Sequence, residues 1–244
     1  MKFVFILTAA FLGTSAASMA PLTYESGGKC MQLTVKQQWE EAKKICKQEA
    51  EAGNRTAMYE YGYMFSTGSG VEKNKSTAKF WYEQAVKKES PYAMYNLATF
   101  YRDGIAGMRD TEQYVMLLKS AADLDFGKAL AELSTLYHQG KVLKKNDKLA
   151  REYSRKAAMT GHAHSAFNYG QFLLQGIGGK TDANGFAWLM VALRLGYRTD
   201  FTEKDLLADF SENEAEKKAR FLKKIDEIVN QIKNNEKILW KKQI

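Results

Sequence analysis

The chain has 244 residues, of which 45% are hydrophobic and 26% are charged, and its formal net charge is +8. This length allows one extended domain or two small ones, and the two prolines suit a nearly all-helical chain. Lysines stand beside acidic residues throughout the predicted helices, so we interpret the positive charge as a solvated surface and expect no nucleic-acid partner.

Residues 1–20 have the pattern of a cleavable signal peptide. Lys2 precedes a short apolar run, and small residues follow, with candidate cleavage sites after Ala17, Ser18 and Ala20. The apolar run is too short to span a bilayer. We therefore expect a protein of the periplasm, or a secreted one, without a stable membrane span.

Residues 21–53 are predicted to form an N-terminal arm followed by a capping helix. The arm extends to about Leu33. Thr34 then offers an N-cap, and Gln37, three residues later, completes a capping box. The helix that follows ends at Gly53 and resembles the second half of a repeat, so we expect it to cover the open end of the repeats that come after it.

The two cysteines of the chain are Cys30 and Cys46. Because an exported protein meets an oxidising compartment, and the two residues are close in sequence, we expect a disulfide between them. The alternative is a buried Cys46 on a helix face with Cys30 unpaired in the arm. A bonded pair would leave no cysteine available as a nucleophile.

Residues 54–200 contain four copies of one pattern with a period of 36 residues, at about 57–92, 93–128, 129–164 and 165–200. A period of this length predicts a stack of supersecondary units. Each copy divides into two helices, A and B. A glycine that suits a left-handed C-cap ends helix A, and an Asn or Asp N-cap six residues later begins helix B. The glycines are Gly68, Gly104, Gly140 and Gly176, and the N-caps are Asn74, Asp110, Asn146 and Asp182.

The loop between helix A and helix B carries a family resemblance. It reads GSGVEKN in the first copy and GIGGKTD in the fourth, and the aromatic pair Trp81 and Tyr82 follows the first loop. A long Gly-x-Gly loop ending in Asn or Asp resembles the Sel-one-like repeat (SLR) family, which is related to the tetratricopeptide repeat. The second and third copies, GIAGMRD and GKVLKKN, lack the second glycine at its usual place. The resemblance covers about Arg55 to Tyr197 and implies an all-α fold, a right-handed α-solenoid of antiparallel helical hairpins.

Residues 201–244 are predicted to form a C-terminal capping region with a long helix. Phe221, Ile225, Ile228 and Ile232 recur at helical spacing and form one apolar stripe. A terminal repeat leaves its hydrophobic face in water unless another element covers it, so we expect the stripe to pack on the last hairpin. The alternative is a basic amphipathic helix that lies on a membrane surface.

The search for catalytic residues predicts neither an active site nor a cofactor. His162 and His164 precede the last helix A, where a spacing of two residues is awkward for a pair of metal ligands, so we predict no metal site. The glycine loops recur once per repeat as helix terminators and lack the Gly-Lys-Ser/Thr of a phosphate-binding loop. We therefore expect a protein that is not an enzyme.

The side of helix A opposite its core positions is predicted to line a concave groove. Aromatic and arginine side chains dominate recognition between proteins, and this side carries five aromatic residues with polar residues between them. The predicted partner-binding residues are Tyr59, Tyr63, Tyr92, Tyr95, Arg102, Lys128, His138, His164, Phe167 and Gln171. The alternative is that the aromatic residues pack between neighbouring helices.

Together these patterns favour a non-catalytic, monomeric interaction module whose partner is another protein, such as an envelope component, held by a segment in the groove. The family resemblance adds a narrower alternative, because some SLR proteins are immunity proteins that neutralise exported toxins such as lipases. A third alternative is a protein that acts on cell-wall or β-lactam compounds. The SLR subgroup linked to those compounds carries a cysteine pair in nearly every repeat, which this chain lacks.

Overall fold

The structure, a computed structural model, describes residues 28–107, 109–208, 210 and 214–243. In the last helix it describes side chains as far as Glu236. Within the described residues the chain is all-α, with twelve α-helices, one short 3₁₀ helix and no strand. The predicted signal peptide, residues 1–20, lies outside the described residues, as do residues 21–27 of the predicted arm.

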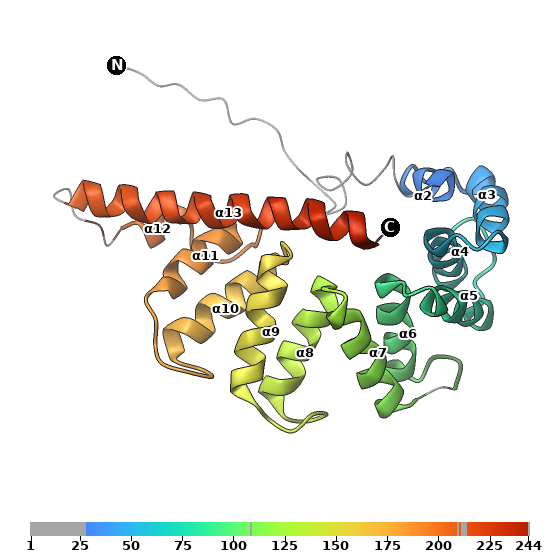
Figure 1. Cartoon of the computed structure of the whole chain (residues 1–244), viewed down its shortest axis with the longest axis horizontal. Helices are drawn as coiled ribbons and strands as arrows, with labels where there is room; N and C mark the ends of the chain where they lie inside the picture. The colour runs from blue at the N-terminus through green and yellow to red at the C-terminus, as the bar shows by residue number, and fades with distance from the viewer. Residues whose placement is uncertain (1–27, 108, 209, 211–213, 244) are drawn as a thin grey trace, which may run out of the picture.

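Eight of the described helices form four antiparallel hairpins, each made of a helix A and a helix B. The hairpins are α4 (Arg55–Thr67) with α5 (Lys75–Lys87), α6 (Pro91–Asp103) with α7 (Thr111–Asp123), α8 (Gly127–Gln139) with α9 (Asp147–Met159), and α10 (Ala163–Gln175) with α11 (Asn184–Arg194). Before them come α2 (Gly28–Val35) and α3 (Trp39–Glu51), and after them come α12 (Glu203–Leu206) and α13 (Ala215–Gln243). Helices α2 to α11 follow an arc, and α13 runs back from its far end (Figure 1). This arrangement confirms the predicted α-solenoid.

The ends of the helices follow the predicted caps except in the last hairpin. Each helix A ends at its glycine in a left-handed conformation, with φ of 85° at Gly68, 68° at Gly104, 69° at Gly140 and 70° at Gly176. The first three B helices begin at the predicted residues, whose side chains accept backbone N–H groups of the first turn. The fourth prediction is wrong, because α11 has Ala183 at its N-cap. Asp182 accepts the Asn184 N–H at 2.8 Å and so holds the turn just before the helix.

The N-terminal segment also differs from its prediction. Residues expected to form an arm belong to α2, and Thr34, the expected N-cap, lies inside this helix, where its hydroxyl donates to the Met31 carbonyl at 3.0 Å. Helix α3 begins after Gln38, whose side chain makes no cap hydrogen bond. The reason is tertiary packing. Helix α2 buries Cys30, Met31 and Leu33 against α3 and α4, and this burial outweighs a local capping box.

A disulfide joins Cys30 in α2 to Cys46 in α3, as the sequence predicts. Both residues are fully buried. The backbone N–H groups of Lys29 and Cys30 donate to the Glu49 carboxylate at 3.2 and 3.3 Å. The first turn of α2 is therefore held to α3 by a covalent bond and by a carboxylate that satisfies its free N–H groups.

The structure explains why the loop between helix A and helix B has a second glycine in the first and fourth copies. Gly70 (φ 69°) and Gly178 (φ 71°) each rest on the first turn of the helix before their hairpin. A Cβ atom would lie 2.4 Å from the Trp39 Cβ in the first case and 2.2 Å from the Asp147 carbonyl oxygen in the second, so no side chain fits. In the second copy the equivalent residue is Ala106, within the 3₁₀ helix η1 (Ile105–Gly107), and it keeps the left-handed conformation with φ 57°.

Replacing Ala106 with glycine is expected to raise the free energy of unfolding by about 1 kcal/mol. A left-handed conformation costs alanine about 1–2 kcal/mol and costs glycine little, and the larger chain entropy of unfolded glycine offsets part of the difference. Urea unfolding followed by circular dichroism measures the change. Ala131→Gly, in the middle of α8, is the control and should lower the same quantity by about 1 kcal/mol. A loss of stability in both variants would contradict the strain at Ala106.

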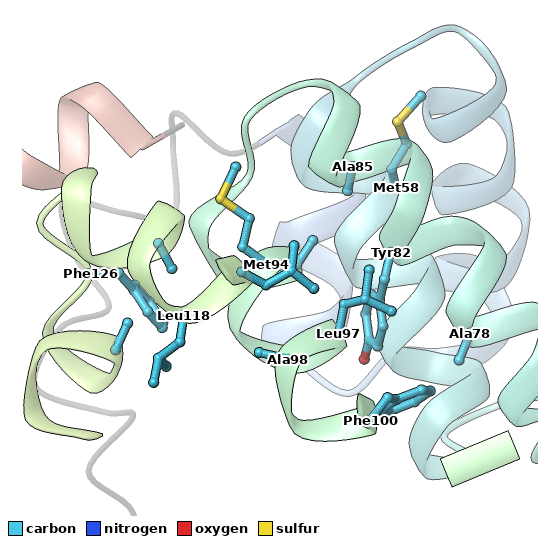
Figure 2. Packing of buried hydrophobic residues seen from close by; sticks show 14 of the residues in the cluster. Met58, Ala78, Tyr82, Ala85, Met94, Leu97, Ala98, Phe100, Leu118 and Phe126 are labelled. Carbon is cyan, nitrogen blue, oxygen red and sulfur yellow. The ribbon is translucent and has the colours of Figure 1, made fainter. Parts of the chain in front are cut away.

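The buried core runs along the stack in two clusters. The first extends from α2 to α9, and Figure 2 shows part of it, with Tyr82 of α5 beside Leu97 and near Phe100 of α6. Among the described side chains that are fully buried, Tyr82 is the largest. Its hydroxyl accepts a hydrogen bond from the Asn96 side chain at 3.2 Å. Each hairpin is therefore held to the next by side chains that cross from helix B into the following helix A.

The second cluster contains the end of the stack and the long C-terminal helix. Helix α13 packs on α11 and α9, where it buries Ile225, Val229 and Ile232. Phe221 and Ile228 of the predicted stripe are half-buried beside them. The stripe covers the last hairpin, as predicted. No helix in the described part of the chain is long and apolar enough to cross a membrane.

Candidate functional site

The predicted groove residues lie on the four A helices, and most of them fall into two groups. In the first group the rings form a continuous row. Centroid distances are 6.2 Å for Tyr63 and Tyr59, 5.4 Å for Tyr59 and Tyr92, 4.9 Å for Tyr92 and Phe126, and 5.5 Å for Phe126 and Tyr95. Such distances are typical of interacting aromatic side chains. The structure brings four predicted residues together and adds Phe126 to them.

This aromatic row is half-buried and opens to solvent at one end. Burial disfavours the charged phenolate and raises the pKa of Tyr59, Tyr92 and Tyr95, in the last case to about 12. Tyr63, at the other end, is 40% exposed. The rings therefore pack against one another and against neighbouring helices, and they also present one exposed edge.

Phe126 contributes to the row at the cost of a helix cap. It occupies the N-cap of α8, where α4, α6 and α10 have Asn54, Ser90 and His162, whose side chains accept a backbone N–H. Helix α8 has no such bond. A cap typically contributes about 1 kcal/mol. At the N-cap of α8, ring contacts of Phe126 with Tyr92 and Tyr95 take the place of the cap hydrogen bond.

Arg102 belongs to a charged network between α6 and α8. Its guanidinium lies 2.7 Å from Asp103 Oδ1 and 2.7 Å from Glu132 Oε1. The Tyr114 hydroxyl donates to the same Glu132 oxygen at 2.6 Å. The hydrogen bonds from Arg102 lower the pKa of Asp103. Arg102 is therefore held in place by its neighbours. Glu132, which is not one of the predicted groove residues, is the centre of the network.

The second group lines a cavity of about 360 Å³ between α8 and α10. Its lining residues are Ser134, Thr135, His138, Gln139, His164, Asn168, Gln171, Phe172, Gln175 and Ile177. Three of these, His138, His164 and Gln171, are predicted groove residues. Hydroxyl, amide and imidazole groups can donate and accept hydrogen bonds. The cavity therefore suits a polar, uncharged group such as a peptide unit.

Several lining side chains are held by neighbours. His138 Nδ1 lies 2.8 Å from Asp147 Oδ1, a hydrogen bond that lowers the pKa of Asp147, and the His138 ring centroid is 5.1 Å from that of Phe172. The hydroxyls of Ser134 and Thr135 donate to backbone carbonyl groups at 2.8 and 3.2 Å. The His138 and Asp147 pair thus lies near two hydroxyls whose protons are already shared with the backbone.

Phe167 borders the cavity group, and Lys128 stands apart from it. The Phe167 ring lies 4.5 Å from that of Tyr197, which lies 5.5 Å from His164. Lys128 is exposed in the first turn of α8. The aromatic row does not continue from α6 to α10 because the third copy has Ala131 at the position where the other three have aromatic residues.

A model of the Sel1 repeat family matches residues 55–90, 91–126, 127–162 and 163–189, which together exceed half of the chain. The chain belongs to the Sel1 repeat family. Each match begins two residues before the repeat start predicted from the sequence. Sel1 repeats mediate interactions between proteins.

Among solved structures, the chain is similar to a Sel1 repeat protein from Oxalobacter formigenes, with 27% identity over 69% of this chain and 70% of that one, and a TM-score of 0.62. It is also similar to a protective antigen of uropathogenic Escherichia coli with an SLR fold, with 21% identity over 89% and 56% of the two chains and a TM-score of 0.44. An immunity protein from Pseudomonas aeruginosa shares 21% identity over 80% and 74%, with a TM-score of 0.48. The similarity to the Oxalobacter formigenes protein supports the assignment of the fold as a Sel1 repeat solenoid.

One row of polar residues in the Sel1 repeats was absent from the predicted groove. The fourth residue of the repeat pattern is Glu60, Asn96, Glu132 and Asn168 in the four copies. Asn96 donates a hydrogen bond to the Tyr82 hydroxyl, and Glu132 accepts one from the Tyr114 hydroxyl, each with a tyrosine of the preceding hairpin. Asn168 lines the cavity. The sequence signal for this row is a polar residue that recurs every 36 residues next to core positions.

His162 has a structural role in the last Sel1 repeat. It is the N-cap of α10, and its Nδ1 accepts the Ser165 N–H at 3.3 Å. Burial, followed by the nearby His164 and Lys128, lowers its pKa to about 4, so the ring stays neutral and keeps the lone pair that the cap requires. In the part of the chain that the structure describes, no three His, Cys, Asp or Glu side chains are placed to hold a metal ion.

Proposed function

We propose that this Sel1 repeat protein is an exported, non-catalytic module that binds a segment of another protein along its A helices. The observation that carries the proposal is the cavity between α8 and α10, where His138, His164 and Gln171 come together. Amide and imidazole side chains offer both donors and acceptors to a peptide backbone. The exposed edge of the aromatic row at Tyr63 supplies apolar contact on the same set of helices.

The polar groups of the cavity favour binding over catalysis. A nucleophile needs a hydroxyl or thiol within reach of a base that can take its proton. The Ser134 hydroxyl donates to the Ala150 carbonyl at 2.8 Å, while His138 is paired with Asp147. The hydroxyl proton is directed to the backbone, which supports a role for these residues in binding a partner.

The disulfide supports export of the protein. Disulfides persist in oxidising compartments such as the periplasm and are rare in the cytosol. The Cys30 and Cys46 bond is fully buried in the α2 and α3 cap. We infer that the chain acts in the periplasm or after secretion.

Affinity capture tests the groove. The full protein is immobilised, and proteins retained from an envelope extract and the culture medium of the encoding organism are identified by mass spectrometry. We expect the combined variant Tyr63→Ala, His164→Ala, Gln171→Ala to bind the captured partner at least about tenfold more weakly, because buried aromatic and hydrogen-bonded contacts dominate interface energies. The identity of the partner separates an envelope component from an exported toxin.

A matched control tests whether a loss of binding is specific to the A helices. Phe80 and Met116 are each 51% exposed and lie on the B helices, so Phe80→Ala with Met116→Ala removes exposed apolar area away from the proposed groove. This control variant should retain the partner with unchanged affinity. Weaker binding of the control together with full binding of the groove variant would place the interface on the B helices.

A further inference from the structure

The cavity between α8 and α10 has a filled counterpart two repeats earlier in the chain, where the Tyr82 ring lies between the first and second hairpins. Gly62 of α4 lies against this ring, because a Cβ atom at that position would be 2.9 Å from it. Asn96 of α6 donates to the Tyr82 hydroxyl at 3.2 Å. The Phe100 ring meets the Tyr82 ring edge to face, with centroids 5.6 Å apart (Figure 2). A phenol therefore fills the space between these two hairpins.

The equivalent residues two repeats later line the cavity, and the phenol is missing. Ser134, Asn168 and Phe172 have the repeat positions of the glycine, asparagine and phenylalanine around Tyr82, and all three line the cavity. At the position of Tyr82 itself, α9 has Ser154. The Ser154 hydroxyl donates to a backbone carbonyl at 3.1 Å, and the residue supplies no ring. The third interface between hairpins thus keeps the surroundings of a phenol without the phenol.

The Asn168 side chain has lost the partner that this repeat position has in the two preceding copies. There the residue is bonded to a tyrosine hydroxyl, Asn96 to Tyr82 and Glu132 to Tyr114. Asn168 is half-buried and makes no hydrogen bond with any group that the structure describes. An amide in this position can donate to an oxygen atom that enters the cavity.

His138 offers an acceptor for a phenol proton. Its Nδ1 lies 2.8 Å from Asp147 Oδ1, and a carboxylate oxygen accepts, so the ring proton is on Nδ1. In the neutral ring, Nε2 then keeps a lone pair. Of the described residues that line the cavity, none is lysine, arginine, aspartate or glutamate. The lining therefore favours an uncharged occupant that both donates and accepts, as a phenol does.

The size of the cavity also suits an aromatic ring. Its volume is about 360 Å³, whereas a cavity of about 150 Å³ is enough to hold benzene. Ser134 is larger than the glycine beside Tyr82, so a bound ring would lie nearer the mouth than the Tyr82 ring does. Thr135, Gln139 and Gln175 are exposed lining residues, which leaves the cavity open to a side chain that enters from the groove.

We propose that this cavity binds the side chain of a tyrosine in the segment that lies along the A helices. Asn168 donates to the phenol oxygen, His138 accepts the phenol proton, and Phe172 packs against the ring. Edge-to-face packing of two rings and a hydrogen bond to the hydroxyl are the contacts that Tyr82 makes in its own interface. The inference rests on the proposed function, because it names one residue of the segment that the groove binds.

Short capped peptides test the tyrosine site without the unidentified partner. Acetyl-Gly-Tyr-Gly-amide is titrated into the full protein beside the phenylalanine and leucine peptides of the same length, and NMR follows the Asn168 amide and the Phe172 ring. We expect the tyrosine peptide to bind about fivefold more tightly than the phenylalanine peptide, through its hydrogen bonds, and at least about tenfold more tightly than the leucine peptide. Equal affinity for the three peptides, or binding of none, would overturn the proposal.

One substitution at two equivalent positions tests the role of the amide. Asn168→Leu should abolish the preference for tyrosine over phenylalanine and keep the affinity for the phenylalanine peptide within about twofold. Asn96→Leu is the matched control, because Tyr82 already fills the corresponding space beside it, and it should keep the preference. Circular dichroism checks the fold of both variants. Loss of the preference in both variants, or in neither, contradicts the assignment.

A second variant fills the cavity from inside. Ser134→Gly with Ser154→Tyr gives the third interface the glycine and the ring of the first, so the tyrosine peptide should bind at least about tenfold more weakly. Unchanged binding to this variant, with a native circular dichroism spectrum, would show that the peptide binds elsewhere. Where this variant does not fold, the comparison of Asn168→Leu with Asn96→Leu decides.

The two proposals fail in different experiments. A captured partner that is indifferent to the groove variant counts against the proposed function. Tyrosine binding that is indifferent to Asn168→Leu counts against the tyrosine site, even where the captured partner depends on His164 and Gln171.

Discussion

Replacing both Cys30 and Cys46 with serine is expected to lower the free energy of unfolding by about 3 kcal/mol. The bond closes a loop of 16 residues, and restricting a loop of this size in the unfolded chain stabilises the native state by about that amount. The loss should be concentrated at the N-terminal end, because the bond holds α2 against α3 and α4. Urea unfolding followed by circular dichroism, with hydrogen exchange to locate the change, measures both effects.

Reduction of the unaltered protein provides the control for this result. A reducing agent should lower the urea midpoint of the natural protein and leave that of the Cys30→Ser, Cys46→Ser variant where it is. In a repeat protein, hydrogen exchange in α10 and α11 should change little, because each hairpin contacts only its neighbours. A variant as stable as the natural protein would show that helix packing alone holds α2 in place.

Tyr82→Ala is expected to be the most damaging single substitution in the first half of the stack, lowering the free energy of unfolding by about 3–5 kcal/mol. The side chain is fully buried, its ring centroid lies 5.6 Å from that of Phe100 and 6.0 Å from that of Tyr59, and its hydroxyl accepts from Asn96. Removing the ring leaves a cavity between two hairpins. Urea unfolding measures the loss.

Two further variants on α5 separate the contribution of the buried ring from that of the hydrogen bond. Tyr82→Phe keeps the ring and removes the hydrogen bond to Asn96, which should cost about 0.5–1.5 kcal/mol. Phe80→Ala removes an aromatic ring that is 51% exposed and should change stability by only about 0.5 kcal/mol. Comparable losses for Phe80→Ala and Tyr82→Ala would contradict the assignment of Tyr82 to the core.

Tyr82 also contacts the aromatic row, because its ring stacks on Tyr59. A change at Tyr82 would therefore alter the stability of the fold and the geometry of the row together.

The features of this fold that depend on near neighbours could be predicted from the sequence. A left-handed glycine at the end of each helix A, such as Gly104, and an N-cap such as Asn74 form bonds within a few residues of themselves. The 36-residue period repeats those local signals four times, so each hairpin could be predicted separately from the sequence. The disulfide was predictable because the chain has only two cysteines and the argument for export was independent of the fold.

Features that depend on contacts between residues far apart in the sequence could not be predicted from local patterns. Thr34 has the local pattern of an N-cap, yet burial of Leu33 and Cys30 against α3 and α4 continues α2 past it. The predicted groove shows the same limit. The sequence alone assigns His138 and Gln171 to one side of their helices, but it does not show that these helices border a cavity.

By itself, the sequence was sufficient for the repeated hairpins and the disulfide, because these follow from periodicity and from bonds between residues that are close in sequence. Tertiary structure decided that Phe126 joins the aromatic row, and that His138 and Gln171 line one cavity. Each of these depends on how far apart neighbouring hairpins stand and which side chains fill the space between them, and packing across the stack sets both.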